Sequence, residues 1–311
     1  HHGDGLRRDP RGGARPVSVV RIDARDAGAV IDLLQSAAQR LRTADGRRGA
    51  TQWIPARGSL LATGDLHDNL PHLQAALTMA ELDASPDRHV ILHELIHGEA
   101  LTGGMDTSYR MLVRVAELVV AYPTQVHPLL ANHELAQACK LRISKGSGEQ
   151  VQLFLDGLDW VFGDEAQQVS DAVDAFILAM PLAVRCDNGL FCAHSTPAPF
   201  ELEQADVTAL DRELDPGSYA DPDAVAWQFT WGRGQTPETA RRMAERLGAR
   251  LMVCGHAYVE QGAEAVGPQL LLLNSDHARG VAVEIPLDGP LPTATELARE
   301  AVFLATIGMD A

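Results

Sequence analysis

Short apolar runs that end in polar residues recur along this chain of 311 residues. Each run has the length that predicts a buried strand rather than a helix. The polar residues after these runs form five clusters, namely Gly64-Asp65-Leu66-His67-Asp68-Asn69, His93-Glu94, Asn132-His133-Glu134, His194 and Gly255-His256. Because α/β sheets gather their binding groups at the carboxyl ends of strands, we expect the five clusters to meet in one site.

Helical patterns alternate with the predicted strands, which favours an α/β fold. Apolar residues recur with a helical period in residues 26–43, 70–82, 107–121, 150–179 and 237–247. Further strands are predicted at 269–273 and 280–285, and an Asn188-Gly189 turn predicts a β-hairpin over 183–193. We expect a flexible tail at 1–18, one domain at 19–288 with a helical insertion at about 144–181, and a C-terminal extension at 289–311.

The charge balance narrows the range of partners. The chain has 26 Lys and Arg residues against 42 Asp and Glu residues, a formal net charge of −16. Binding to a nucleic-acid backbone is not expected, because it requires a basic surface. No apolar run reaches the length of a membrane helix, so no membrane partner is expected. The four cysteines form no Cys-x-x-Cys pair, which favours a reducing compartment and predicts a cytoplasmic location.

Oxygen and imidazole donors dominate the five clusters, and no cysteine is among them. This mixture suits divalent metals such as Mn²⁺, Fe²⁺ and Zn²⁺. Two such ions a few ångströms apart can hold a phosphate group, activate a bridging water and stabilise the leaving oxygen. Single clusters have simpler explanations: Asn132 could cap a helix, and a lone histidine such as His194 is more often a hydrogen-bonded core residue than a ligand.

Four of the clusters match known motifs in order. Gly64-Asp65-Leu66-His67, Asn132-His133-Glu134, the run that ends in His194, and Gly255-His256 resemble the metal-binding blocks of the calcineurin-like metallophosphoesterases. The likeness is greatest to the serine/threonine phosphoprotein phosphatase branch and extends over residues 60–285. Trp231-Gly232-Arg233 resembles the segment that carries a substrate-binding arginine in that branch.

The resemblance implies a fold of two facing mixed β-sheets flanked by helices. It also implies two divalent metal ions (Mn, Fe or Zn) and hydrolysis of a phosphorylated protein or small molecule by metal-bound hydroxide. Asp65, His67 and Glu94 would hold the first ion. Glu94, Asn132, His194 and His256 would hold the second. His133 would protonate the leaving group, and Arg233 would clamp phosphate oxygens.

The second block departs from the family pattern. Glu94 stands where the family has a bridging Asp, His97 stands where it has another Asp, and Gly98 stands where it has a phosphate-binding Arg. We expect Asp106 to replace that second Asp as a catalytic group and Arg110 to replace the phosphate-binding Arg, each from a displaced position.

Two other functions fit part of the sequence. His93-Glu94-Leu95-Ile96-His97 is a His-Glu-x-x-His string, which on a helix would hold one zinc through His93 and His97 and use Glu94 as the base of a peptidase. That hypothesis leaves the other four clusters unexplained. The altered second block would also suit a non-catalytic scaffold with a degenerate metal centre.

Overall fold

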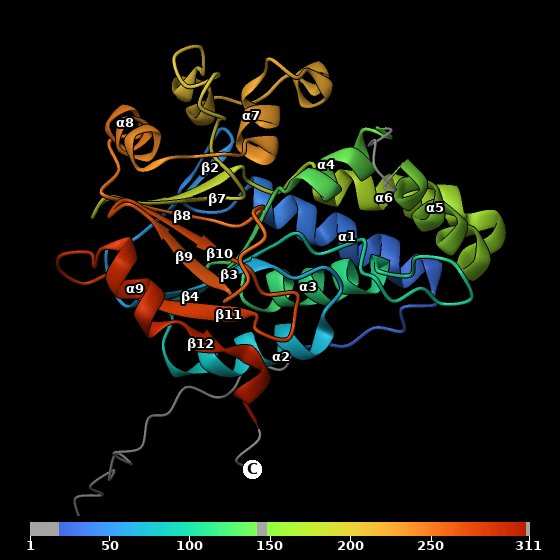
Figure 1. The fold of residues 1–311 in the computed structure, drawn as a ribbon. Helices are drawn as coiled ribbons and strands as arrows, with labels where there is room; N and C mark the ends of the chain where they lie inside the picture. Colours follow the sequence, from blue (N-terminus) through green and yellow to red (C-terminus); the bar gives the residue numbers. More distant parts are fainter. Residues whose placement is uncertain (1–18, 142–147, 309–311) are drawn as a thin grey trace, which may run out of the picture.

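The computed structural model describes residues 19–141 and 148–308, and within them two β-sheets face each other (Figure 1). The larger sheet has the strand order β1-β2-β6-β7-β8-β10-β9 and the smaller sheet the order β12-β11-β3-β4-β5. The strands of the larger sheet are β1 (Arg47–Arg48), β2 (Thr51–Ile54), β6 (Ala183–Cys186), β7 (Leu190–Ala193), β8 (Leu251–Cys254), β10 (Leu270–Leu273) and β9 (Ala263–Val266). Those of the smaller sheet are β12 (Val302–Phe303), β11 (Val281–Pro286), β3 (Ser59–Asp65), β4 (Arg88–His93) and β5 (Val126–Leu129).

Both faces of the central strands are buried, which explains why they are continuous apolar runs. Leu60 of β3 and Val253 of β8 point into the space between the two sheets, whereas their neighbours Leu61 and Met252 belong to the core beneath the helices. β3, β4 and β5 are parallel to one another, and so are β7, β8 and β10. An isolated bridge between Asp65 and Asn274 links the two sheets where these strands end.

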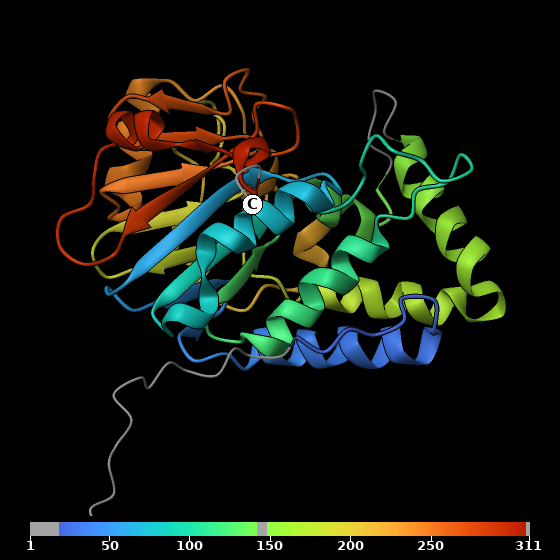
Figure 2. The same cartoon turned by 90° about the horizontal axis from the view of Figure 1, so that it is seen from below.

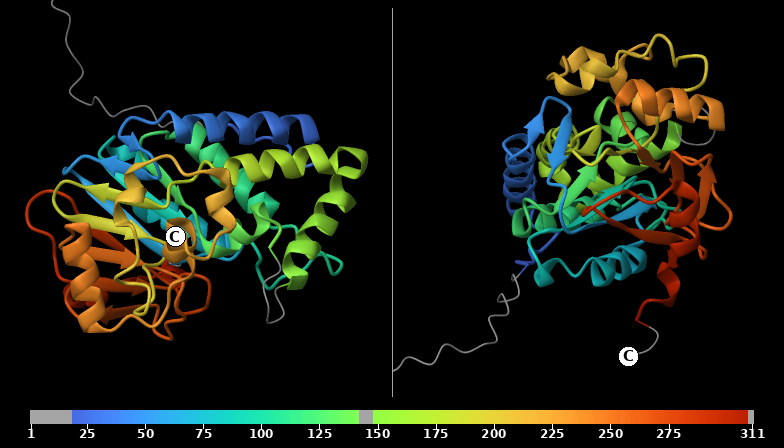
Figure 3. Two further views of the ribbon diagram at one scale, coloured as in Figure 1. Left: turned by 90° about the horizontal axis from the view of Figure 1, so that it is seen from above. Right: turned by 90° about the vertical axis from the view of Figure 1, so that its left-hand side faces the viewer.

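Helices cover the outer faces of the sandwich and extend to one side of it (Figures 1 and 2). Their bounds are α1 (Ala27–Arg42), α2 (Leu70–Ala80), α3 (Tyr109–Ala121), α4 (Asn132–Ala138), α5 (Gly148–Phe162), α6 (Ala166–Ile177), α7 (Val225–Trp231), α8 (Pro237–Leu247) and α9 (Ala294–Glu300). α1 packs against α3 and α6, and α2 packs on β3 and β4. The segment that contains α7 and α8 lies over the larger sheet (Figure 3).

Most of the predicted elements are confirmed. The hairpin joins antiparallel β6 and β7, and Gly189 has the positive φ of 99° that its turn requires. The predicted helical segment at 150–179 covers most of α5 and all of α6. The strands β1, β2, β9 and β12 and the helices α7 and α9 were not predicted.

Parts of the expected domain division lie outside the described residues, namely the tail at 1–18, the first residues of the insertion at 144–147, and 309–311. Within the described part of the chain, no helix combines the length and apolar character needed to cross a bilayer.

Candidate metal centre

The five polar clusters meet where the strands of the two sheets end. Asp65 is the last residue of β3, and Glu94 directly follows β4. Asn132 begins α4, just after β5, while His194 and His256 follow β7 and β8. These residues, except His194, line a pocket of about 160 Å³ together with His67, His133, Arg233, Tyr258, Asn274 and Asp276. Side chains up to 191 positions apart in the sequence therefore share one site.

Three of these residues surround His194 in a compact group of four. Its Nε2 lies 2.7 Å from Asn132 Oδ1, 3.1 Å from His256 Nδ1 and 3.1 Å from Glu94 Oε2. All four side chains are buried. The amide oxygen of Asn132 faces only lone-pair-bearing atoms, an arrangement that repels unless the amide is reversed or a cation lies between the atoms. Imidazole nitrogens with carboxylate and amide oxygens are a donor set for divalent metals, so this group fits a metal ion.

A second group lies on the other side of the Glu94 carboxylate. Glu94 Oε1 is 3.8 Å from His67 Nε2 and 3.4 Å from His133 Nε2. His67 Nδ1 lies 3.0 Å from the main-chain oxygen of Ile96, to which it can donate, so the lone pair of Nε2 is free to face the site. One carboxylate thus presents one oxygen to each group, which is the placement that a bridging ligand needs.

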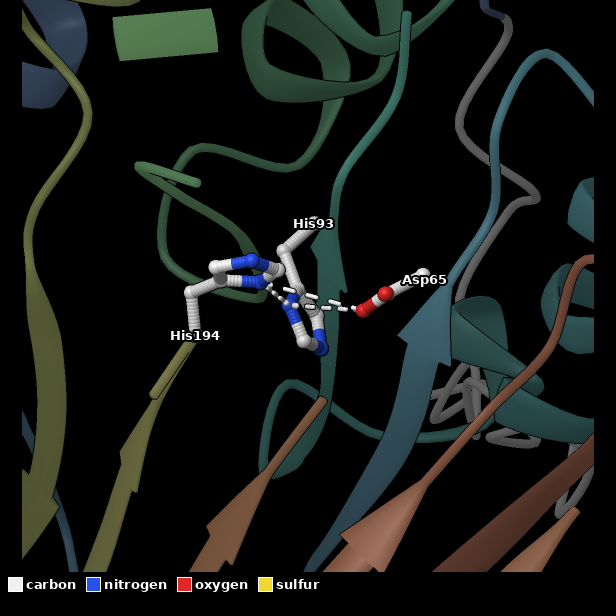
Figure 4. Close-up of side chains that lie close together, drawn as sticks. All are labelled: Asp65, His93 and His194. Carbon is white, nitrogen blue, oxygen red and sulfur yellow. Dashed lines mark hydrogen bonds and ion pairs between the residues drawn. The ribbon is translucent and has the colours of Figure 1, made fainter. Parts of the chain in front are cut away.

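A third group contains His93, to which the resemblance to the phosphoesterases assigns no role. The side chains of Asp65, His93 and His194 point toward one another from β3, β4 and the end of β7 (Figure 4). Asp65 Oδ1 lies 3.9 Å from His93 Nδ1 and 3.8 Å from His194 Nδ1. Asp65 Oδ1 also accepts a hydrogen bond from the backbone N–H of His256, at 2.8 Å. Asp65 is therefore tied to the end of the neighbouring strand β8.

Burial makes charge costly throughout the centre. It raises the pKa of Asp65 and raises that of Glu94 further, where Glu134 and Asp65 add like charge. It lowers the pKa of His194, that of His256 to about 3, and that of His133 to about 2, with nearby cationic groups adding to each shift. A divalent cation would reverse this preference for the carboxylates, because it favours their ionised form. It would agree with the preference of the imidazoles, which bind metals as neutral rings.

Several residues at the site adopt strained backbone conformations. The φ angles are +40° at His67, +51° at Glu94, +60° at His97 and +65° at His256. Positive φ is uncommon outside glycine, and clusters of such residues mark functional sites. The buried carboxylate of Glu134 helps to hold one of these loops, since it accepts hydrogen bonds from the backbone N–H groups of Leu95 at 2.6 Å and Ile96 at 3.2 Å. Glu134 was within a recognised cluster but had been given no role.

Comparison with known proteins agrees with this geometry. A family model described as calcineurin-like phosphoesterase matches residues 58–260. The chain belongs to the calcineurin-like phosphoesterase family. Membership makes it a hydrolase that acts on phosphate esters. No curated protein shows significant sequence similarity to the chain.

Solved structures share the calcineurin-like fold at low identity. A serine/threonine phosphatase from Saccharomyces cerevisiae, with similarity to human phosphatase PP5, matches with a TM-score of 0.64 and 12% identity, over 84% of this chain and 82% of that one. A cold-active protein-tyrosine phosphatase from a psychrophilic Shewanella species matches with a TM-score of 0.51 and 10% identity, over 78% and 82%. The predicted fold of two facing mixed sheets is confirmed.

The phosphoesterase fold does not place the His-Glu-x-x-His string on a helix. His93 is the last residue of β4, and Glu94 and His97 have left-handed backbone conformations in the following loop. His93 contacts His194, whereas His97 contacts His133, so the two side chains serve different surroundings. The geometric basis of the peptidase hypothesis is therefore wrong, because i and i+4 share a face only on a helix.

Asp106 and Arg110, which were expected to replace the family's second-block Asp and Arg, lie outside the pocket. His97 Nδ1 is 3.0 Å from His133 Nδ1, so His97 itself occupies the place beside the expected general acid. Asp106 instead accepts a hydrogen bond from the backbone N–H of Ser108 at 2.8 Å, near the start of α3. Asp106 and Arg110 both act on the pKa of Asp68. Burial raises that pKa to about 6, the charge of Asp106 also raises it, and the charge of Arg110 lowers it. Neither is among the residues that line the pocket, whereas Arg233 is.

Arg110 lies beside a different cavity. It lines a volume of about 340 Å³ between α2 and α3, together with Arg21 and Arg114. Its guanidinium carbon lies 5.9 Å from the centre of the Tyr109 ring. Arg233 Nη2, in contrast, is 3.4 Å from His256 Nδ1. Of the two expected phosphate-binding arginines, only Arg233 lines the pocket of the candidate centre.

Proposed function

We propose that this phosphoesterase hydrolyses phosphate monoesters at a centre of two divalent metal ions. The observation that carries the proposal is the Glu94 carboxylate, with Oε2 3.1 Å from His194 and Oε1 3.4 and 3.8 Å from His133 and His67. Two such ions would supply positive charge for the phosphate oxygens and a water of lowered pKa as the nucleophile. They would also offset the acidity of a chain with net charge −16 when it binds an anionic substrate.

The protein residues have separate tasks in this proposal. Glu94, Asn132, His194 and His256 would hold one ion. Glu94 with His67 and Asp65 would hold the other; Asp65 also hydrogen-bonds His256. Arg233 would bind the phosphate from the rim.

His133 would deliver the proton to the leaving oxygen. Burial lowers its pKa to about 2, and the negative charge of a bound phosphate would raise that pKa again. His133 Nε2 faces the pocket beside Glu94, and its Nδ1 is held by His97. His97 Nε2 in turn lies 3.2 Å from Gln137 Oε1. The orientation of the His133 ring is thus fixed by the neutral groups His97 and Gln137. In the family pattern an Asp carboxylate stands at the position of His97.

Metal analysis and turnover test the proposal together. We expect the purified chain to bind two divalent ions, to hydrolyse an aryl phosphate when Mn²⁺, Fe²⁺ or Zn²⁺ is supplied, and to lose that activity on chelation. Full activity in a metal-free sample would refute the two-metal mechanism. Metal binding without turnover of any phosphate ester would instead support the non-catalytic scaffold.

Variants of Glu94 test the bridging position directly. Glu94→Ala should reduce the bound metal, while Glu94→Asp should keep part of it, since aspartate tolerates the left-handed backbone of this position. Glu99→Ala is a matched control, because Glu99 is an exposed carboxylate five positions along the same loop. Equal metal content in Glu94→Ala and Glu99→Ala would contradict the assignment.

The substrate is proposed to be a phosphorylated protein or small molecule, because the pocket of about 160 Å³ accommodates a phosphate group and leaves the rest of the ester outside. The described cysteines are all free, which supports the expected reducing, cytoplasmic location.

A further inference from the structure

His93 contacts His194 on the side of its ring that faces away from the proposed metal centre. None of the family motifs assigns His93 a role. It ends β4, its residue is only 2% exposed, and it packs across from Gly255. A Cβ at Gly255 would lie 2.4 Å from His93 Cε1, so the site has space for the imidazole only because glycine stands there. Such complementary packing indicates that the ring position is well defined.

The hydrogen bonds of His93 determine which of its nitrogens carries a proton. Nε2 lies 3.0 Å from the main-chain oxygen of Thr63. A carbonyl oxygen can only accept, so Nε2 must be the N–H donor. His93 is buried, its two hydrogen-bond partners are a carbonyl oxygen and another imidazole, and Asp65 Oδ1 is 3.9 Å from Nδ1, so the ring is neutral because a buried charge needs a close partner. In a neutral ring with a proton on Nε2, Nδ1 bears a lone pair and can only accept.

The proton of His194 follows from that of His93. The two Nδ1 atoms are 2.8 Å apart, which is a hydrogen-bond distance. Since His93 Nδ1 accepts, His194 Nδ1 must donate, and the lone pair of His194 Nε2 is left facing Asn132, Glu94 and His256. We propose that His93 is a positioning residue that holds His194 in the tautomer and orientation needed to bind metal through Nε2. The link to metal binding rests on the proposed function, whereas the tautomers do not.

The same atoms also permit a competing arrangement. His93 Nδ1, His194 Nδ1 and Asp65 Oδ1 are separated by 2.8, 3.8 and 3.9 Å. A point equidistant from all three is about 2.1 Å from each, close to a zinc–ligand distance. In that arrangement His93 would be a ligand, and His194 would bind through Nδ1 instead. The two arrangements predict opposite protonation of His194.

Nitrogen NMR of metal-free protein labelled with ¹⁵N-histidine distinguishes the two. We expect the Nε2–H tautomer for His93 and the Nδ1–H tautomer for His194, with resonances assigned from single His93→Asn and His194→Asn variants. An Nε2–H tautomer for His194 would overturn the proposal. This measurement needs no metal, so it tests the tautomers of His93 and His194 even if the chain binds no metal ion.

Metal titration then tests the consequence. The hydrogen-bond partners of metal-ligating histidines each contribute about 10–100-fold to metal affinity. We expect His93→Leu to bind Mn²⁺ or Zn²⁺ about 10–100-fold more weakly, with two ions still bound at saturation. His93→Asn should restore most of the affinity, because its side-chain oxygen can accept from His194 near the position of the lost Nδ1.

A control variant and three outcomes complete the test. His89→Leu removes a buried histidine from the other end of β4, where His89 Nδ1 lies 3.1 Å from His127 Nε2, and should leave metal affinity unchanged. Wild-type affinity in His93→Leu would refute the positioning role. Loss of one bound ion in both His93→Leu and His93→Asn would identify His93 as a ligand. If the wild-type chain binds no metal, the proposed function fails and the NMR result stands alone.

Discussion

Gly255→Ala should damage the metal centre without removing any ligand. An added Cβ would lie 2.2 Å from Asp65 Oδ1 and 2.4 Å from His93 Cε1. Cβ atoms in real proteins essentially never approach other atoms closer than 3.0 Å, so the Asp65 oxygen must move by about 0.8 Å. Metal–ligand distances tolerate only about 0.2 Å. The substitution should therefore weaken metal binding, by at least about tenfold on the scale of other changes around metal ligands.

The same clash also predicts a loss of stability. Overpacking of a closely packed interior costs about 1–3 kcal/mol. We expect urea denaturation of the chelated protein to show a decrease of this size in the free energy of unfolding. Gly255 has no positive φ, so the effect would come from the clash and not from backbone strain.

Gly217→Ala is the matched control for both measurements. Gly217 lies in the 3-10 helix Pro216–Ala220, has no positive φ, and an added Cβ there would meet nothing within 4 Å. We expect its metal affinity to equal that of the wild type and its stability to lie within about 0.5 kcal/mol of it. Equal metal affinity in Gly255→Ala and Gly217→Ala would refute the reasoning, because it would mean that Asp65 can move without consequence for the centre.

Three further outcomes are expected. His133→Asn should lower turnover of an alkyl phosphate by about 10²–10⁴ and that of an aryl phosphate with a good leaving group by less; loss of bound metal in this variant would make His133 a ligand. Glu134→Ala should lower stability by about 1–3 kcal/mol for each of the two buried N–H groups left without a partner, as measured in urea, whereas Glu134→Gln keeps an acceptor and should cost less. Burial lowers the pKa of His127 to about 3, compared with about 6.5 in the unfolded chain. The stability that depends on the neutral ring is therefore complete above about pH 6.5 and is lost progressively as the pH falls toward 3. The loss is about 2 kcal/mol at pH 5. His127→Phe should therefore lose less stability than the wild type between pH 7 and pH 5, and an equal loss would contradict the assignment.

The strands that build the site were predictable because both of their faces are buried. β8 and β10 are continuous apolar runs, and β3 contains the shorter run Leu60-Leu61-Ala62. Such a run can be recognised without knowledge of the strands that pair with it. β2 (Thr51–Ile54) was missed because its half-polar sequence becomes a strand only through pairing with β6 and β1. α9 was also missed, although Thr293 and Glu296 form a capping box at its start.

Within the candidate site, the sequence alone determined which residues could meet. Asp65 is the last residue of β3, and Asn132, His194 and His256 come within three residues after β5, β7 and β8. The carboxyl ends of parallel strands lie at the same edge of a sheet, whatever the conformation of the loops. The resemblance of these clusters to the family motifs then predicted metal-dependent phosphoesterase chemistry without any knowledge of distances. That part of the prediction needed only local order along the chain.

Only the tertiary structure determined where the side chains of the second block, residues 93–98, point. The loop after β4 has left-handed residues at Glu94 and His97, and such conformations are held by distant hydrogen bonds, among them those from Leu95 and Ile96 to Glu134. Which way His93 and His97 point therefore depends on residues up to 101 positions away, such as His194. A sequence pattern carries spacing along the chain, but the direction of a side chain in a strained loop is fixed by the groups that pack around it, and only the folded chain brings those groups together.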